Sequence, residues 1–101
     1  MFNLNEKTMD AYRQKINAQI KEMKAKMTML ESEVEKSSAD IRIKYQAKVD
    51  ELKPRLKEIE EKLNQLSDSS QEAWDEIRVG IDQSMSELRT ALANATKHFN
   101  N

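Results

Sequence analysis

Apolar residues recur at intervals of three and four along almost the whole chain, and this spacing constrains the fold more than any other feature. Side chains at such intervals line one face of an α-helix, which has 3.6 residues per turn. One stripe runs from Met9 to Leu66, with Ser38 as its polar interruption, and a second runs from Trp74 to Phe99. The chain has only one Gly and one Pro, so it lacks the residues that turns and sheets need. We therefore predict an all-α protein of the coiled-coil type.

The stripes place two helices in one helical domain of residues 8–101, preceded by an N-terminal tail of residues 1–7. The first helix is predicted from about residue 8 to 66, because Pro54 faces outward and should kink the helix rather than end it. Residues 67–70 form the clearest turn, since Ser69 and Glu72 have the spacing of a capping box. The second helix then spans about residues 70–99.

If the second helix folds back at this turn, the two stripes face each other in an antiparallel helical hairpin. Trp74 then meets Leu63, and Phe99 lies beside the small residue Ser38. We expect Trp74, Leu63 and Phe99 to lock the hairpin, since a Trp in the first turn of a helix is more often a packing residue than a recognition anchor.

The hairpin leaves the N-terminal half of the first helix uncovered, because a helix of residues 8–66 is roughly 88 Å long and its partner only about 44 Å. If this half stayed exposed, the chain would lose about 10 to 20 kcal/mol of stabilising free energy from apolar burial, which is comparable with the whole stability of a small domain. We call this stripe the N-terminal seam; it consists of Met9, Tyr12, Ile16, Ile20, Met23, Met27, Leu30 and Val34.

Two arrangements would bury the N-terminal seam. In the first, the helix stays straight and the seam packs against a second chain, giving a homo-oligomer, with a dimer favoured. In the alternative, the chain bends near residues 37–40, where Ser37 could cap a new helix, and forms a monomeric three-helix bundle. The sequence favours the assembly, because nothing between Met1 and Lys53 breaks a helix and serine costs little within one.

Three segments resemble small bacterial coiled-coil proteins of about a hundred residues that have no assigned function. They are AYRQKINAQIKEM, SSADIRIKYQAKVDEL and SSQEAWDEIRVGIDQSMSEL, and the resemblance covers roughly residues 9–99. It depends on Tyr12, the segment around Tyr45, and the helix start at Glu72, Ala73 and Trp74. Pro54 and the many Met residues depart from the more Ala-rich pattern of that family. The resemblance implies a coiled coil, but no activity, cofactor or functional residue.

The residue types argue against catalysis, and we expect no enzyme activity, no metal and no cofactor. The chain has no Cys, and its one His, His98, lacks the Glu at position 95 that a di-iron helix motif would need, since that residue is Ala95. Carboxylate pairs such as Glu60 and Glu61 lie off the apolar stripe, without a pocket to raise a pKa.

Charge and hydropathy limit the partners and the location. The basic stretch from Arg13 to Lys26 is interpreted as a solvated helix face, because Lys and Glu alternate and no aromatic cluster supports contacts with bases, so no nucleic acid is expected. No apolar run is long enough to span a membrane and the first fifteen residues lack the pattern of a secretory signal. A cytoplasmic location is predicted.

The function predicted is that of a structural or adaptor protein that acts through helix–helix self-association and the binding of a protein partner. Met29, Ile43 and Val79 lie off the stripes and indicate a second contact face. The alternative is an amphipathic protein of a lipid surface or granule, which would use Met1, Phe2, Leu4 and residues 74–99. The function at a lipid surface is disfavoured, because a helix that binds anionic lipid should have a polar face rich in Lys and Arg, whereas residues 71–99 carry five acidic and three basic side chains.

Overall fold

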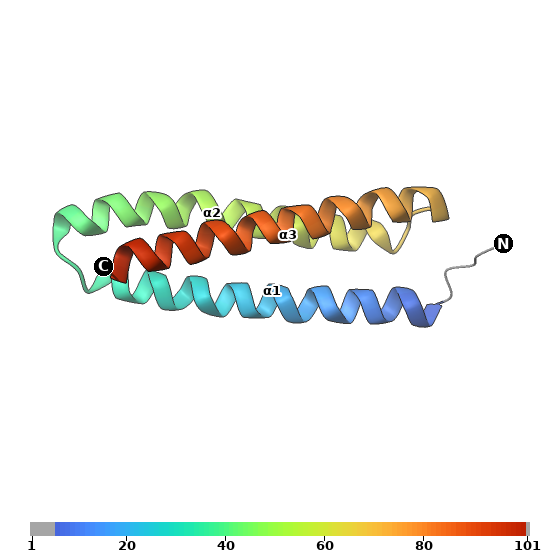
Figure 1. Cartoon of the computed structure of the whole chain (residues 1–101), viewed down its shortest axis with the longest axis horizontal. Helices are drawn as coiled ribbons and strands as arrows, with labels where there is room; N and C mark the ends of the chain where they lie inside the picture. The colour runs from blue at the N-terminus through green and yellow to red at the C-terminus, as the bar shows by residue number, and fades with distance from the viewer. Residues whose placement is uncertain (1–5, 101) are drawn as a thin grey trace.

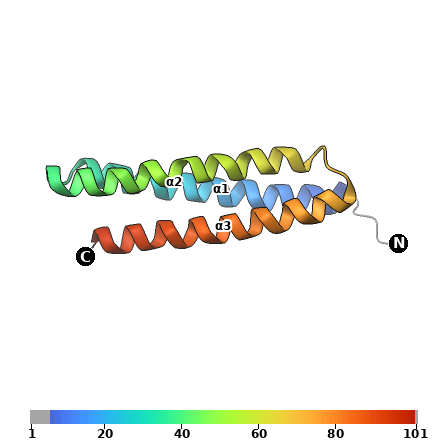
Figure 2. The same cartoon turned by 90° about the horizontal axis from the view of Figure 1, so that it is seen from above.

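The computed structural model describes residues 6–100 and folds them into three helices packed as a bundle of 58 × 19 × 17 Å. The helices are α1 (Glu6–Glu35), α2 (Ala39–Leu66) and α3 (Gln71–Asn100), and the described residues contain no strand. Figures 1 and 2 show that α1 and α3 run in the same direction and α2 runs in the opposite one. The all-α prediction is confirmed.

The prediction of one continuous helix over residues 8–66 is wrong, because the chain breaks between Glu35 and Ala39. The break lies at residues 36–38, at the edge of the segment 37–40 named in the three-helix alternative. A bend there lets α2 and α3 cover the apolar face of α1, so tertiary burial outweighs the modest helix propensity of three residues.

The bounds of the first helix also differ from the prediction. Helix α1 begins at Glu6, two residues before the predicted start. Residues 1–5, which make up most of the predicted tail and include Met1, Phe2 and Leu4 of the lipid alternative, lie outside the described residues, as does residue 101.

The core is one continuous apolar cluster shared by the three helices. Helix α1 buries six residues of the N-terminal seam, from Ile16 to Val34, each no more than 4% exposed. Met9 and Tyr12 are partly buried against the same cluster. The remaining buried members are Val49, Leu52, Leu56, Ile59, Leu63, Leu66, Trp74, Ile81, Met85, Leu88, Leu92 and Ala95.

The turn between α2 and α3 is closed by hydrogen bonds of its own serines. Ser70 is the N-cap of α3, since its Oγ accepts from the backbone N–H of Ala73 at 3.3 Å, and the Ser69 hydroxyl donates to the Leu66 carbonyl at 2.8 Å. The predicted capping box placed the cap one residue too early, at Ser69. Helix α2 continues through the exposed Pro54, as predicted.

Two ion pairs connect α1 and α2. Lys24 of α1 meets Glu60 of α2, and Lys53 of α2 meets Glu31 of α1, each pair at 2.9 Å. The hydrogen bond to Glu31 raises the pKa of Lys53 above its ordinary value.

The predicted register of α2 and α3 needs a correction. Phe99 packs edge-on against Tyr45, with ring centroids 5.1 Å apart, and therefore not beside Ser38, two helical turns away. The stripe repeats every three or four residues, so a shift of two turns keeps every apolar side chain inside while changing its partner.

Candidate functional site

The N-terminal seam, predicted as the surface that binds a second chain, lies inside the bundle. Its residues from Ile16 to Val34 are covered by α2 and α3 of the same chain. The uncovered stripe from which an oligomer was inferred is therefore absent from this conformation. A surface that binds other molecules must be sought among residues the bundle leaves accessible.

Of the residues of the predicted hairpin lock, Trp74 contacts α1 and Phe99 contacts α2. Trp74 and Leu63 are buried and Phe99 is partly buried, but the aromatic neighbour of Trp74 is Tyr12, whose ring meets it edge-on at 5.6 Å. The Arg78 guanidinium lies 5.6 Å from the centre of the Trp74 ring, on its face. Two helices that are 36 residues apart in the chain are thus joined at this end of the bundle.

A polar group completes the contact between α1 and α3. The Tyr12 hydroxyl donates to Asp82 Oδ1 at 2.7 Å and lies 3.3 Å from the Arg78 carbonyl oxygen. Burial, and then the hydrogen bond and negative charge of Asp82, raise the pKa of Tyr12 well above its ordinary value, while the Arg78 charge opposes this. The hydroxyl is therefore a persistent donor and no candidate for a general base.

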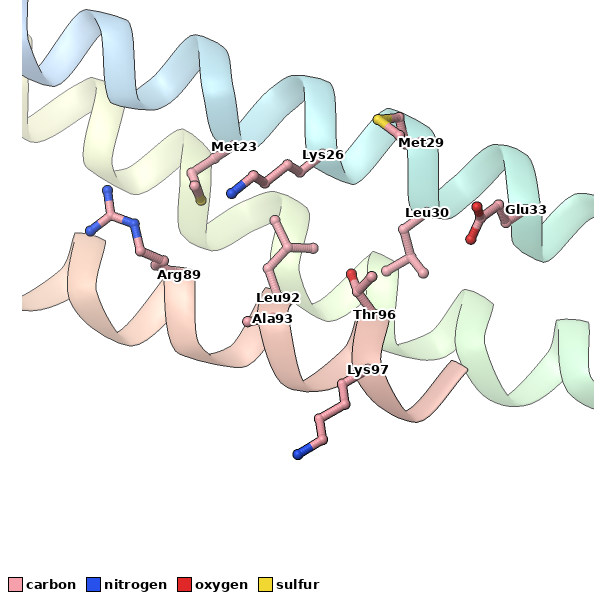
Figure 3. Close-up of a pocket in the computed structure, with 10 residues that line it drawn as sticks. All are labelled: Met23, Lys26, Met29, Leu30, Glu33, Arg89, Leu92, Ala93, Thr96 and Lys97. Carbon is pink, nitrogen blue, oxygen red and sulfur yellow. The ribbon is translucent and has the colours of Figure 1, made fainter. Parts of the chain in front are cut away.

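One groove in the surface lies between α1 and α3, in the half of the bundle away from Tyr12. Figure 3 shows Met23, Leu30, Leu92 and Thr96 between the two helices. The groove has a volume of about 440 Å³. It is lined by Met23, Lys26, Met29, Leu30 and Glu33 of α1 and by Arg89, Leu92, Ala93, Thr96 and Lys97 of α3.

The groove exists because the two helices that line it stay apart and present small side chains there. Of the three helix pairs, α1 and α3 approach each other least closely. Ala93 and Thr96 cannot reach across the space that a Leu or Phe would fill, so a groove remains above the buried Met23, Leu30 and Leu92. Met29, 65% exposed, adds a flexible apolar side chain at the edge.

The rim of this groove is basic although the chain as a whole carries a net charge of −1. Lys26, Arg89 and Lys97 stand against one carboxylate, Glu33. Lys26 is paired with Glu22 at 3.0 Å, and Lys97 extends away from α1 in Figure 3. An apolar floor with a basic rim suits an amphipathic helix whose polar flanks are acidic.

Sequence reasoning found only part of this groove. It marked Met29 as an off-stripe contact residue, but not Ala93, Thr96 or Arg89. The sequence does place two small residues, Ala93 and Thr96, next to the apolar stripe of α3. Their spacing indicates a groove only when α1 is known to lie beside that face of α3. Ile43 and Val79, the other marked residues, are also exposed, at 73% and 55%.

No group of three or more His, Asp or Glu side chains in residues 6–100 is placed to hold a metal ion. His98 lines a separate surface hollow between α2 and α3, beside Tyr45 and Ala95. No helix in the same part of the chain is both long and apolar enough to cross a membrane.

Comparisons with family models, with curated proteins and with solved structures give no match.

Proposed function

We propose that this protein is a non-enzymatic adaptor that acts by helix–helix association, and that it holds an acidic amphipathic helix of a partner protein in the groove between α1 and α3. The observation that carries the proposal is a groove with apolar side chains at its base, the exposed Met29 at its edge and a basic rim, on a bundle whose large apolar side chains are mostly buried. A fourth helix laid in the groove would complete a four-helix arrangement.

The electrostatics of the rim favour one kind of helix. No ion pair holds Arg89 or Lys97 within the described residues, so both cations are available to carboxylates on an incoming helix. A helix with Leu along one face and Glu on its flanks would cover Met29, Ala93 and Thr96 while pairing with these cations. The same helix with Lys flanks would meet like charges at the rim.

Two designed peptides test the proposal. They share one Leu face and differ only in Glu or Lys flanks, and their binding is followed by amide chemical-shift changes in the ¹⁵N-labelled protein. We expect saturable binding of the Glu peptide, with shifts gathered at residues 23–33 and 89–97, and at least about tenfold weaker binding of the Lys peptide. Equal binding of both, or shifts spread over the whole bundle, would contradict the proposal.

A matched pair of variants checks the position. Ala93 and Ala47 are both exposed helix residues, but only Ala93 lines the groove. Ala93→Phe should fill the groove and abolish binding of the Glu peptide, whereas Ala47→Phe should leave it unchanged. Both variants should keep the helix content of the parent protein.

A further inference from the structure

The connection between α1 and α2 is held by little except the packing of the helices themselves. Lys36 and Ser37 continue the helical turn, since their N–H groups donate to Glu33 and Val34. Ser38 is extended, with φ −61° and ψ 159°, and its side chain makes no cap hydrogen bond. Joining α1 to α2 would require ψ of Ser38 to rotate to a helical value of about −42°.

The connection between α2 and α3 is different. It contains the Ser70 cap and the Ser69 hydroxyl bond, and Arg13 of α1 donates to the Ser67 hydroxyl at 2.8 Å. The hydroxyl of Ser37 instead donates to the Glu33 carbonyl four residues back, a bond that serine also makes within a continuous helix. The first connection can therefore straighten at little local cost, and the second cannot.

The apolar stripe also crosses the first connection without losing its phase. Val34, Ser38, Ile41 and Tyr45 follow one another at intervals of four, three and four. A bend at Ser38 does not require this, because two separate helices can each turn their apolar face inward independently. A continuous helix does require it, since only then do both halves present one face to a partner.

We propose that the chain exchanges α1 with a second copy of itself, forming a dimer in which residues 6–66 are one helix of about 92 Å. In this dimer α1 of each chain packs on α2 and α3 of the other, with the contacts that it makes within one chain in the bent form. The ion pairs Lys24–Glu60 and Glu31–Lys53 would then form between the two chains. The midpoint of each pair in the sequence is residue 42, so the two-fold axis of the dimer would pass near residue 42. The proposal goes beyond partner binding at the groove and does not depend on it.

The exchanged dimer creates one contact that the bent form lacks. Ile41 is 44% exposed in the bent form although it lies on the stripe. With the two-fold axis near residue 42, Ile41 would approach its counterpart in the second chain and become buried. The long side chain of Arg42 can extend away from the axis into solvent. Ile43, still more exposed, lies off the stripe and would remain outside.

Substitutions at the connection separate the two forms. Ala39→Pro places proline at the first position of α2, where the N–H makes no hydrogen bond in the bent form and the extended Ser38 suits a following proline. In a continuous helix the same proline would weaken the dimer by at least about a thousandfold. Ser38→Ala should instead strengthen the dimer about fivefold, because alanine raises helix propensity in both chains.

Sedimentation equilibrium after refolding at high protein concentration measures these effects. We expect a dimer of twice 11.8 kDa for the parent chain, more of it for Ser38→Ala, and monomer alone with full helix content for Ala39→Pro. Ile41→Glu should weaken the dimer at least about tenfold and Ile43→Glu should leave it unchanged. A parent chain and Ser38→Ala that both stay monomeric at millimolar concentration, or an Ala39→Pro variant that dimerises like the parent, would overturn the proposal.

A cross-link distinguishes exchange from association of intact bundles. The chain has no Cys, so Lys24→Cys and Glu60→Cys can be made in separate chains, refolded together and treated with a short bifunctional thiol reagent. Exchange places the two thiols close together in different chains, so a covalent heterodimer is expected. If the parent chain dimerises but this pair does not cross-link, bundles associate through their outer surfaces and no exchange occurs.

Discussion

The Tyr12 hydroxyl donates to the Asp82 carboxylate at 2.7 Å, and this hydrogen bond joins α1 to α3 across the end of the bundle where Trp74 is buried. The residues are 70 positions apart in the chain. The contact therefore forms only after α1 folds against α3, and it reports on the position of α1.

Tyr12→Phe should lower the free energy of unfolding by about 1 kcal/mol, because the ring contact with Trp74 is kept while the hydrogen bond is lost. The raised pKa of Tyr12 means that its contribution is fully present below the ordinary tyrosine pKa of about 10 and is lost as the pH rises beyond that value. Urea unfolding, followed by fluorescence of the single Trp, should give a constant difference between parent and variant from pH 7 to 9 that shrinks above pH 10.

The titration of Tyr12 itself provides the control. In a Tyr45→Phe background Tyr12 is the remaining tyrosine, and its ionisation can be followed by ultraviolet absorbance. We expect a midpoint above about 10 that moves back toward this value in Asp82→Asn, which removes the negative charge. A midpoint at the ordinary value in both proteins would mean that the hydroxyl is not held by Asp82.

Neighbouring residues on α1 test whether the N-terminal seam is buried. Leu30→Ala should lower the free energy of unfolding by about 2 to 5 kcal/mol, since Leu30 is only 2% exposed, whereas Met29→Ala should change it by less than about 0.5 kcal/mol. Thermal unfolding at several low protein concentrations measures both. Similar effects from the two substitutions would show that this face of α1 is not packed as described.

The sequence predicted the core better than the path of the chain. The three-and-four spacing of residues such as Ile16 and Leu88 identified an apolar face, because burial of a helix requires one whatever the neighbouring helix is. The bend at residues 36–38 was placed only in the less favoured alternative, because Lys-Ser-Ser is compatible with a helix. Only the tertiary contacts of α1 favour breaking it there.

The sequence also could not predict which residues the stripe side chains contact in the bundle. Trp74 was placed opposite α2, and Phe99 beside Ser38, by assuming a two-helix hairpin with no third helix. In a three-helix bundle each stripe faces two neighbours, and the repeat does not say which neighbour a residue such as Trp74 contacts. The groove depends on the spacing of α1 and α3, so its small residue Ala93 carried no signal by itself.

Gly80→Ala should stabilise the protein by up to about 1 kcal/mol. Gly80 lies within α3 with a negative φ, and a Cβ built there meets no atom within 4 Å, so alanine gains helix propensity without a clash. Chemical unfolding of parent and variant measures the gain. A loss of stability would indicate that another molecule approaches α3 closely at Gly80 under the conditions of the measurement.

Anionic vesicles should neither pellet the protein nor change its helix content. The residues of α3 that would contact acyl chains, including Ile81 and Leu88, are buried in the bundle. The exposed large apolar residues are spread over the three helices: Met29 on α1, Ile41 and Ile43 on α2, and Val79 on α3. Lipid binding would therefore require the bundle to open, and the acidic excess of residues 71–99 opposes an anionic surface. Co-sedimentation and circular dichroism at low salt test this, with neutral vesicles as the control. Pelleting by anionic vesicles alone, with Trp74 fluorescence shifted to the blue by lipid, would instead support the function at a lipid surface.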